Sequence, residues 1–255
     1  MDRFNVAVDV VQNAGDLLRQ CRLEEAEICQ KTGHQDLVTH WDRKIEQLLR
    51  NEILTAFPQD SIVGEEYPPE AHRTGSMTWY IDPIDGTTNF INQHQNYAIS
   101  VGCWEGNTPL FGLVLDVERE TLYWGKHGGA WQDQTPIHTS GRRELSELLL
   151  TTPGLQYTFL EPHPYQERMI RLSRKVRGVR CLGSVALELC EVAAGRADLF
   201  VTMRSSPWDH NAARIILEEA GGAVFTVDGD ELPLDQKSTV LAFNAMELKD
   251  CILCV

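Results

Sequence analysis

One short stretch, residues 79–90, constrains the fold of this chain more than any other. It reads Trp-Tyr-Ile-Asp-Pro-Ile-Asp-Gly-Thr-Thr-Asn-Phe, so apolar residues that suit a strand are followed by two acids and a helix start. Carboxylates such as Asp82 and Asp85 suit Mg²⁺, and free amides such as those of Gly86 and Thr87 suit a phosphate. The stretch therefore predicts a strand-to-helix turn that holds cations and an anion. An ordinary turn is the competing interpretation, because Asp, Pro and Gly also form turns.

The spacing of apolar residues predicts helices before this stretch and an antiparallel meander after it. One helix is expected over residues 2–30. A second is expected over 39–57, where Thr39 and Asp42 have the spacing of a capping box, so Asp42 is first interpreted as a helix-start residue. Short strands are expected at 61–63, 97–104, 110–116, 121–126 and 129–131.

From about residue 146 the pattern changes to strands that alternate with helices. We expect strands at 148–152, 179–182, 197–201, 223–227 and 239–243, and helices at 164–176, 184–194 and 208–220. This alternation favours a mixed or parallel sheet covered by helices, and hence an α/β (α+β) protein. The chain is expected to form a single domain, residues 1–255, with two subregions at about 1–145 and about 146–255.

The bulk composition excludes some classes of partner. The formal net charge of −14 argues against nucleic-acid or anionic-membrane binding, because both require a basic surface. No apolar run reaches the ~18 residues of a membrane span. The seven scattered cysteines suit a reducing cytoplasm.

Two further acidic motifs follow predicted strands. Glu65 and Glu66 come after the strand at 61–63, and Asp209 opens the helix at 208–220. Each has an ordinary explanation by itself, as a solvated turn or a helix-start acid. Together with Asp82 and Asp85, however, they suggest one shared acidic site.

These motifs resemble those of the inositol monophosphatase family, whose members are Mg²⁺-dependent, lithium-sensitive phosphatases. The resemblance spans about residues 4–245 and implies a layered α-β-α-β-α sandwich of the inositol monophosphatase and fructose-1,6-bisphosphatase type. It also implies a small phosphate ester as substrate and a homodimer. It is carried by Asp36–Asp42, Gly64–Glu66, Trp79–Asn89, Gly183–Ala186, Trp208-Asp209 and Glu219–Gly222.

The resemblance assigns a role to each matching residue. Glu65, Asp82 and the carbonyl of Ile84 would hold one Mg²⁺, and Asp82 would bridge to a second ion. That second ion would also be held by Asp85 and Asp209, and a third, weaker ion would lie on Glu65. Glu66 would act through a water on the metal. Thr87 and Asp42 would orient and deprotonate the attacking water, while the substrate would contact Gly86, Thr87, Gly183, Ser184 and Ala186.

The match is weaker in the predicted loop from Thr202 to Pro207. Thr202 stands where inositol-specific members carry a glutamate, seven residues before the last metal aspartate, and Arg204 adds a cation. Both are candidate substrate contacts, although Arg204 also fits a plain surface residue. Alternatives to an inositol 1-phosphate-like substrate are therefore fructose 1,6-bisphosphate, histidinol phosphate or a 3′,5′-bisphosphate nucleotide. A mainly regulatory, protein-binding member is a further alternative.

Overall fold

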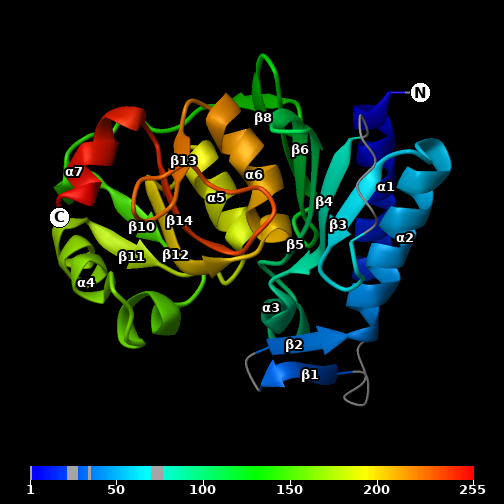
Figure 1. Ribbon diagram of the computed structural model, residues 1–255, viewed down its shortest axis with the longest axis horizontal. Coiled ribbons are helices and arrows are strands. Elements are labelled where there is room, and N and C mark those ends of the chain that lie inside the picture. The colour runs from blue at the N-terminus through cyan, green and yellow to red at the C-terminus, as the bar shows by residue number, and fades with distance from the viewer. Residues whose placement is uncertain (1, 22–27, 34–35, 70–76) are drawn as a thin grey trace.

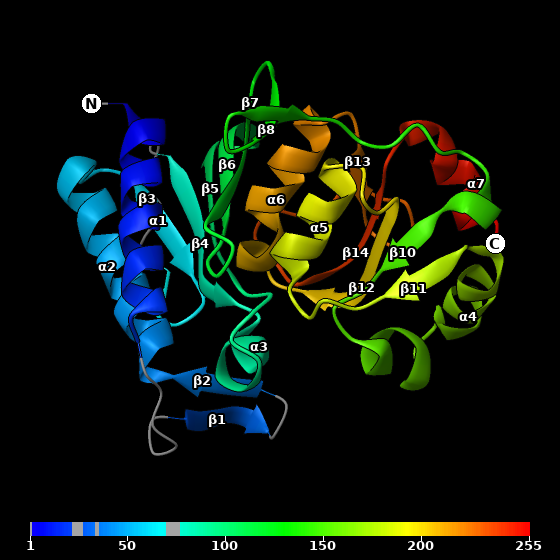
Figure 2. The same cartoon turned by 180° about the vertical axis from the view of Figure 1, so that it is seen from behind.

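The protein is built of alternating helical and sheet layers. A computed structural model describes residues 2–21, 28–33, 36–69 and 77–255. Helices α1 (Arg3–Arg19) and α2 (His40–Ala56) cover one face of a seven-stranded sheet, as Figure 1 shows. Helices α5 (Val185–Ala193) and α6 (Pro207–Glu219) lie between this sheet and a five-stranded sheet. The predicted α-β-α-β-α order is confirmed, because α4 (Gln166–Lys175) and α7 (Lys249–Leu253) cover the outer face of the second sheet (Figure 2).

The seven-stranded sheet contains the predicted meander. Its strands follow the chain order, with β3 and β4 parallel and all later neighbours antiparallel. Strand β9 extends the meander beyond the predicted residues. The strands are β3 (Ser61–Gly64), β4 (Thr78–Asp85), β5 (Ala98–Glu105), β6 (Thr108–Asp116), β7 (Thr121–Lys126), β8 (Gly129–Gln132) and β9 (Thr135–Ile137).

The five-stranded sheet is mixed, as the alternation of strands and helices predicted. Its order is β11-β10-β12-β14-β13, and β10 is parallel to both of its neighbours. The carboxyl ends of β10, β11 and β12 therefore meet at one edge of the sheet. The strands are β10 (Leu149–Thr151), β11 (Gly178–Arg180), β12 (Leu199–Ser205), β13 (Ala223–Phe225) and β14 (Ser238–Phe243).

The predicted first helix was too long. Helix α1 ends at Arg19, and a hairpin of β1 (Ile28–Gly33) and β2 (Asp36–Thr39) follows. The buried face of α1 stops at Leu18, because the positions that would continue it, residues 22 and 25, are Arg and Glu. The part of the prediction at 22–27 lies outside the described residues. The second helix was placed to within a residue at each end.

Helix α6 lies unusually close to the seven-stranded sheet. Gly102, Gly112 and Gly125 are register partners on β5, β6 and β7, so they form a row across the sheet. A Cβ at Gly112 would lie 2.1 Å from the carbonyl oxygen of Ala212, a residue of α6. The glycine row thus lets α6 rest directly on the sheet, with its first turn toward the end of β4. No helix among the residues with a described structure is long and apolar enough to cross a membrane.

Candidate active site

The turn after β4 has the predicted strand-to-helix form. Strand β4 ends at Asp85, and α3 (Thr87–Asn92) begins two residues later. Gly86 caps the helix with a φ of 94°, a left-handed conformation that favours glycine. The backbone N–H of Ile84 donates to Oδ1 of buried Asp82 at 3.0 Å. The sequence motif therefore folds into a strand-to-helix turn whose approach is stabilised by Asp82.

Asp42 belongs both to a helix cap and to this turn. Its Oδ2 accepts hydrogen bonds from the Thr39 backbone N–H at 2.7 Å and the Thr39 hydroxyl at 2.8 Å. Its Oδ1 accepts the Thr87 hydroxyl at 3.2 Å, and that hydroxyl also lies 3.0 Å from the Ile84 carbonyl. Burial raises the pKa of Asp42 to about 6, with nearby Glu65 and Glu66 adding to the shift. Asp42 therefore caps α2 and faces the site at once.

Asp85 joins the two halves of the molecule. Its Oδ2 accepts the Ser184 hydroxyl at 2.5 Å and the Ala186 backbone N–H at 2.7 Å, and its Oδ1 accepts the Val185 N–H at 3.3 Å. These donors form the start of α5. Burial raises the pKa of Asp85 to about 6, although these hydrogen bonds oppose the shift. Of the predicted substrate contacts, Ser184 and Ala186 thus bind Asp85 directly.

Asp209 lies in the first turn of α6 as part of a capping box. Its Oδ2 accepts the Ser206 backbone N–H at 2.7 Å. Burial raises the pKa of Asp209 well above its usual range, and the charges of Asp85 and Glu65 raise it further. The pKa of Asp82 is also raised well above its usual range, by burial and then by Glu65, Asp85 and Asp209. The predicted acids are therefore brought close enough to repel one another.

The Glu65-Glu66 turn depends on two residues that the sequence analysis did not single out. Glu46 is fully buried in α2, where its carboxylate accepts Arg50 Nε at 2.8 Å and the Glu66 backbone N–H at 2.6 Å. A Cβ at Gly64 would lie 2.2 Å from Oε1 of Glu46. The sequence signal for this contact was the spacing of Glu46 and Arg50, an acid and a base four residues apart in the predicted helix, which favours an ion pair.

Glu188 is a second buried acid that the sequence analysis missed. Its Oε1 accepts the backbone N–H groups of Leu182 at 2.5 Å and Gly183 at 3.3 Å, while its Oε2 has no partner among the described residues. Burial raises the pKa of Glu188 to about 8, with a contribution from Asp85. Glu188 thus stabilises the turn at Gly183 through hydrogen bonds made in the protein interior.

The acid cluster suits hard cations by its chemistry. Its members raise one another's pKa, so a bound divalent cation would relieve their repulsion, and all of its donors are oxygens. Among the residues that the structure describes, no three acidic, histidine or cysteine side chains already converge on one point. Both carboxylate oxygens of Asp85 instead accept hydrogen bonds from the start of α5. The donor set therefore fits Mg²⁺, and cation binding would draw the side chains together.

The predicted substrate loop is in fact largely strand. Strand β12 continues to Ser205, although its pairing with β14 shifts between Thr202 and Ser205. The prediction of a loop from Thr202 was wrong, since backbone pairing persists through this irregularity. Buried Thr202 donates to the Arg204 carbonyl at 2.9 Å, and the exposed Arg204 side chain lies over the ring of Tyr157.

His210 is fully buried with its Nδ1 2.8 Å from the Ser205 hydroxyl.

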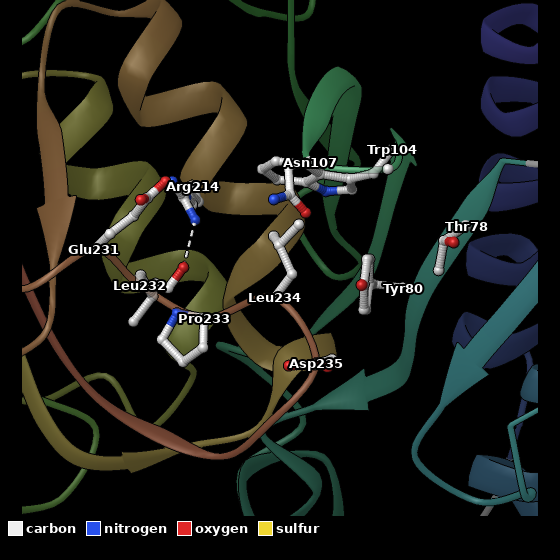
Figure 3. A pocket seen from close by; sticks show the side chains of 11 residues that line it. Thr78, Tyr80, Trp104, Asn107, Arg214, Glu231, Leu232, Pro233, Leu234 and Asp235 are labelled. Carbon is white, nitrogen blue, oxygen red and sulfur yellow. Dashed lines mark hydrogen bonds between the residues drawn. The ribbon is translucent and has the colours of Figure 1, made fainter. Parts of the chain in front are cut away.

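A separate cavity of about 390 Å³ lies beside α6. Figure 3 shows Trp104, Asn107 and Arg214 along one wall and Tyr80 and Asp235 along another. The Arg214 guanidinium donates to the Leu232 carbonyl at 3.1 Å, which connects α6 to the segment 231–235 that also lines the cavity. None of the acids of the cluster lines this cavity, so it is distinct from the candidate active site.

Comparison with known proteins identifies the family of this chain. Residues 2–254 match the model of the inositol monophosphatase family. The inositol-1-monophosphatase of Bacillus subtilis is 36% identical over 242 residues, which cover 94% of this chain and 91% of that protein. Human inositol monophosphatase 2 is 35% identical over 242 residues, 91% of this chain and 82% of that protein.

Solved structures of inositol monophosphatases have the same fold as this chain. The inositol monophosphatase of Thermotoga maritima has a TM-score of 0.85 at 31% identity, covering 100% of this chain and 96% of its own. Staphylococcus aureus inositol monophosphatase II, solved with inositol monophosphate bound, has a TM-score of 0.86 at 28% identity, with 100% and 93% coverage. From its whole-length match, its fold and its acid cluster, this chain belongs to the inositol monophosphatase family of phosphoric monoester hydrolases.

Proposed function

We propose that this protein is a Mg²⁺-dependent phosphomonoesterase that hydrolyses a small polyol or sugar phosphate. The observation that carries the proposal is the gathering of carboxylates from α2, β4 and α6 around the turn after β4, where Asp42 accepts the Thr87 hydroxyl and neighbouring charges raise the pKa of Asp82 and Asp209. The relatives named inositol monophosphatase support the same reaction, including the S. aureus protein solved with inositol monophosphate. Bisphosphorylated sugars or nucleotides and histidinol phosphate are the alternative substrates for this site.

Two or three Mg²⁺ ions would be held by the acid cluster. Glu65, Asp82 and the carbonyl of Ile84 would hold the first, while Asp82, Asp85 and Asp209 would hold the second. A third, weaker ion would lie on Glu65. When bound, Mg²⁺ supplies positive charge that acidifies water and stabilises the leaving oxygen of an in-line displacement. Li⁺ is expected to inhibit by competing at this cluster.

Thr87 and Asp42 would orient and deprotonate the attacking water. The Thr87 hydroxyl lies 3.2 Å from Asp42 Oδ1 and 3.0 Å from the Ile84 carbonyl oxygen, so the water would meet a hydroxyl held beside the Asp42 carboxylate. A pKa of about 6 leaves Asp42 ionised at neutral pH and suits a general base. Glu66 would help to place this water.

The phosphate would bind at the start of α3. The first N–H groups that return to the carbonyl of Gly86 belong to Asn89 and Phe90. The N–H groups of Gly86 and Thr87 precede them and have no acceptor within the helix, which is where an anion binds. Gly183 and Ser184, at the start of α5, would face the same group from the second half of the molecule.

A phosphate-release assay tests the proposal. The substrates are inositol 1-phosphate, fructose 1,6-bisphosphate, histidinol phosphate and 3′,5′-adenosine bisphosphate, each with and without Mg²⁺ and Li⁺. Asp82→Asn and Asp209→Asn should lower Mg²⁺-dependent turnover by more than about 100-fold, because each removes a carboxylate from the cation site. Both variants should fold, since an amide relieves the repulsion within the cluster. Absence of Mg²⁺-stimulated release from all four substrates would contradict the proposal.

We also propose a cytoplasmic homodimer. The reducing compartment is supported by the free thiols of Cys103 and Cys190, both buried in the core. The homodimer rests on the family resemblance, and light scattering coupled to size exclusion at micromolar concentration tests it. A mass of about 29 kDa, that of the single 28.8 kDa chain, would contradict it.

A further inference from the structure

Arg204 is held in a defined position by an aromatic ring. Its guanidinium carbon lies 3.4 Å from the centre of the Tyr157 ring, which is the separation of a face-to-face stack. Tyr157 is partly buried in the π-helix Gln156–Leu160, which follows β10. A guanidinium that stacks through its face keeps the N–H groups of its edge available for acceptors.

The backbone of β12 is also shaped to present Arg204. The pairing with β14 is irregular between Thr202 and Ser205, as in a β-bulge. Buried Thr202 stabilises the irregular backbone. Its hydroxyl donates to the Arg204 carbonyl at 2.9 Å and accepts the Arg204 N–H at 3.4 Å. Bulges redirect side chains and are common beside active sites. Thr202 therefore supports the presentation of Arg204.

Arg204 and Tyr157 lie at the same sheet edge as the acid cluster. Since β10 is parallel to β11 and β12, the segments that follow these three strands share one edge. Tyr157 follows β10, Ser184 follows β11 and binds Asp85, and Asp209 follows β12. Figures 1 and 2 show the helical turn between β10 and α4 on the same side of the molecule as α3. Ligands of such sheets bind at the carboxyl ends of the strands.

Arg204 differs in its electrostatic environment from three ion-paired arginines of the chain. Arg142, Arg196 and Arg214 form ion pairs of 2.8–2.9 Å with acidic side chains, whereas Arg204 forms none with the acids of the described residues. In a chain of net charge −14, a stacked cation without an acidic partner is available to an anionic ligand. A guanidinium edge binds phosphate or carboxylate through two parallel hydrogen bonds.

We propose that Arg204, positioned by Tyr157 and Thr202, binds a second anionic group of the substrate, at a distance from the phosphate that is hydrolysed. The preferred substrates are then phosphate esters with a second phosphate or carboxylate rather than monophosphates of neutral polyols. This inference rests on the proposed phosphatase function and specifies its substrate class.

Steady-state kinetics of the full-length, Mg²⁺-loaded enzyme test this proposal. The substrates are inositol 1-phosphate, with no second anion, fructose 1,6-bisphosphate, with a second phosphate, and 3-phosphoglycerate, with a carboxylate. Arg204→Ala should lower kcat/KM for a doubly anionic substrate roughly 10- to 100-fold, mainly through KM, because charged hydrogen bonds are lost. The value for inositol 1-phosphate should stay within about twofold. The two doubly anionic substrates distinguish a phosphate subsite from a carboxylate subsite.

Matched variants separate this role from general effects of charge and folding. Arg174→Ala removes an exposed arginine from α4 and should leave every ratio unchanged. Tyr157→Leu should lower kcat/KM for the doubly anionic substrate about 3- to 10-fold, whereas Tyr157→Phe keeps the ring and should retain the preference. Thermal unfolding of each variant verifies that it is folded.

The possible outcomes distinguish failure of the Arg204 subsite from failure of the proposed phosphatase function. If inositol 1-phosphate is hydrolysed as efficiently as both doubly anionic substrates, or if Arg204→Ala affects all three equally, the inference is wrong and the phosphatase function stands. If the wild-type enzyme releases no phosphate from any substrate with Mg²⁺, the proposed function fails and the inference fails with it. A selective loss for doubly anionic substrates supports both.

Discussion

At the residue scale, Asp42 shows how one side chain serves two purposes. One carboxylate oxygen caps α2 through Thr39, and the other accepts the Thr87 hydroxyl. The T-x-x-D spacing predicted the first contact from local geometry alone. The second contact joins residues 45 positions apart and required the fold. A capping box and a catalytic pair are therefore compatible interpretations of the same aspartate.

Thr87→Val should lower turnover about 100- to 1,000-fold while Mg²⁺ binding is retained. Valine has the shape of threonine but cannot donate to Asp42 Oδ1 or to the Ile84 carbonyl, so the attacking water would lose the hydroxyl that we propose orients it. Steady-state kinetics with calorimetric Mg²⁺ titration provide the measurement. Thr88→Val, at the exposed next position, is the control and should be nearly neutral. Full activity of Thr87→Val would contradict the role of this hydroxyl.

Glu188→Gln should flatten the pH dependence of stability above about pH 6.5. Burial raises the pKa of Glu188 to about 8 in the folded protein from 4.5, so the folded state binds the extra proton. The free energy of unfolding therefore falls as pH rises from about 4.5 to about 8. Asp42 and Asp85, whose pKa values lie at about 6, add the same trend at lower pH in both proteins.

Urea denaturation in EDTA at pH 6.5 and 8.5 measures this effect. The wild type should lose about 2 kcal/mol more than the variant over this interval, since each pH unit corresponds to about 1.4 kcal/mol. Equal losses in the two proteins would show that Glu188 is already ionised at pH 6.5.

At the element scale, α2 and β3 meet through a buried ion pair. Glu46 pairs with Arg50 within α2 and reaches across to the Glu66 backbone N–H. This contact requires Gly64, because any side chain there would collide with the Glu46 carboxylate. The turn that carries Glu65 and Glu66 is thus positioned by a neighbouring helix rather than by its own sequence.

Gly64→Ala should weaken cation binding more than it affects helix or strand content. The added Cβ would lie 2.2 Å from Oε1 of Glu46, so either the carboxylate or the turn must move, and Glu65 would move with it. We expect about 1–3 kcal/mol of destabilisation, as for other overpacked cores, and at least a severalfold weaker Mg²⁺ affinity. Calorimetric titration and urea denaturation measure both. Gly141→Ala, where a Cβ meets nothing within 4 Å, is the control.

At the scale of the whole molecule, the candidate active site depends on two sheets that share one helical layer. Helices α5 and α6 pack between the sheets, and their first turns carry Ser184 and Asp209 to the end of β4. The glycine row on β5, β6 and β7 sets how closely α6 approaches. Site geometry and the packing of the two halves are therefore coupled.

Gly112→Ala tests this coupling. Its Cβ would lie 2.1 Å from the carbonyl oxygen of Ala212, which is backbone and cannot rotate away, so α6 must shift. We expect destabilisation of about 2–4 kcal/mol and weaker Mg²⁺ binding, because Asp209 moves with α6. Urea denaturation with and without Mg²⁺ measures both effects. A folded variant with unchanged Mg²⁺ affinity would show that Asp209 is positioned independently of the glycine row.

The sequence by itself predicted most of the elements of this protein, and its family resemblance predicted their layers. Periodicity located most strands and helices, and the Asp82–Thr87 turn could be predicted because its acids, glycine and helix start are neighbours in the chain. The predictions were wrong at the end of α1, where the apolar face stops at Leu18, and in β12, where strand pairing continues past an irregularity to Ser205.

Only the tertiary structure decided which of these groups meet. The contacts of Asp85 with Ser184, of Glu46 with the Glu66 amide and of Arg204 with Tyr157 join residues from separate elements. No spacing in the sequence encodes them, because they depend on how closely helices pack on the sheets. The raised pKa values have the same origin, since burial and neighbouring charge are properties of the assembled site.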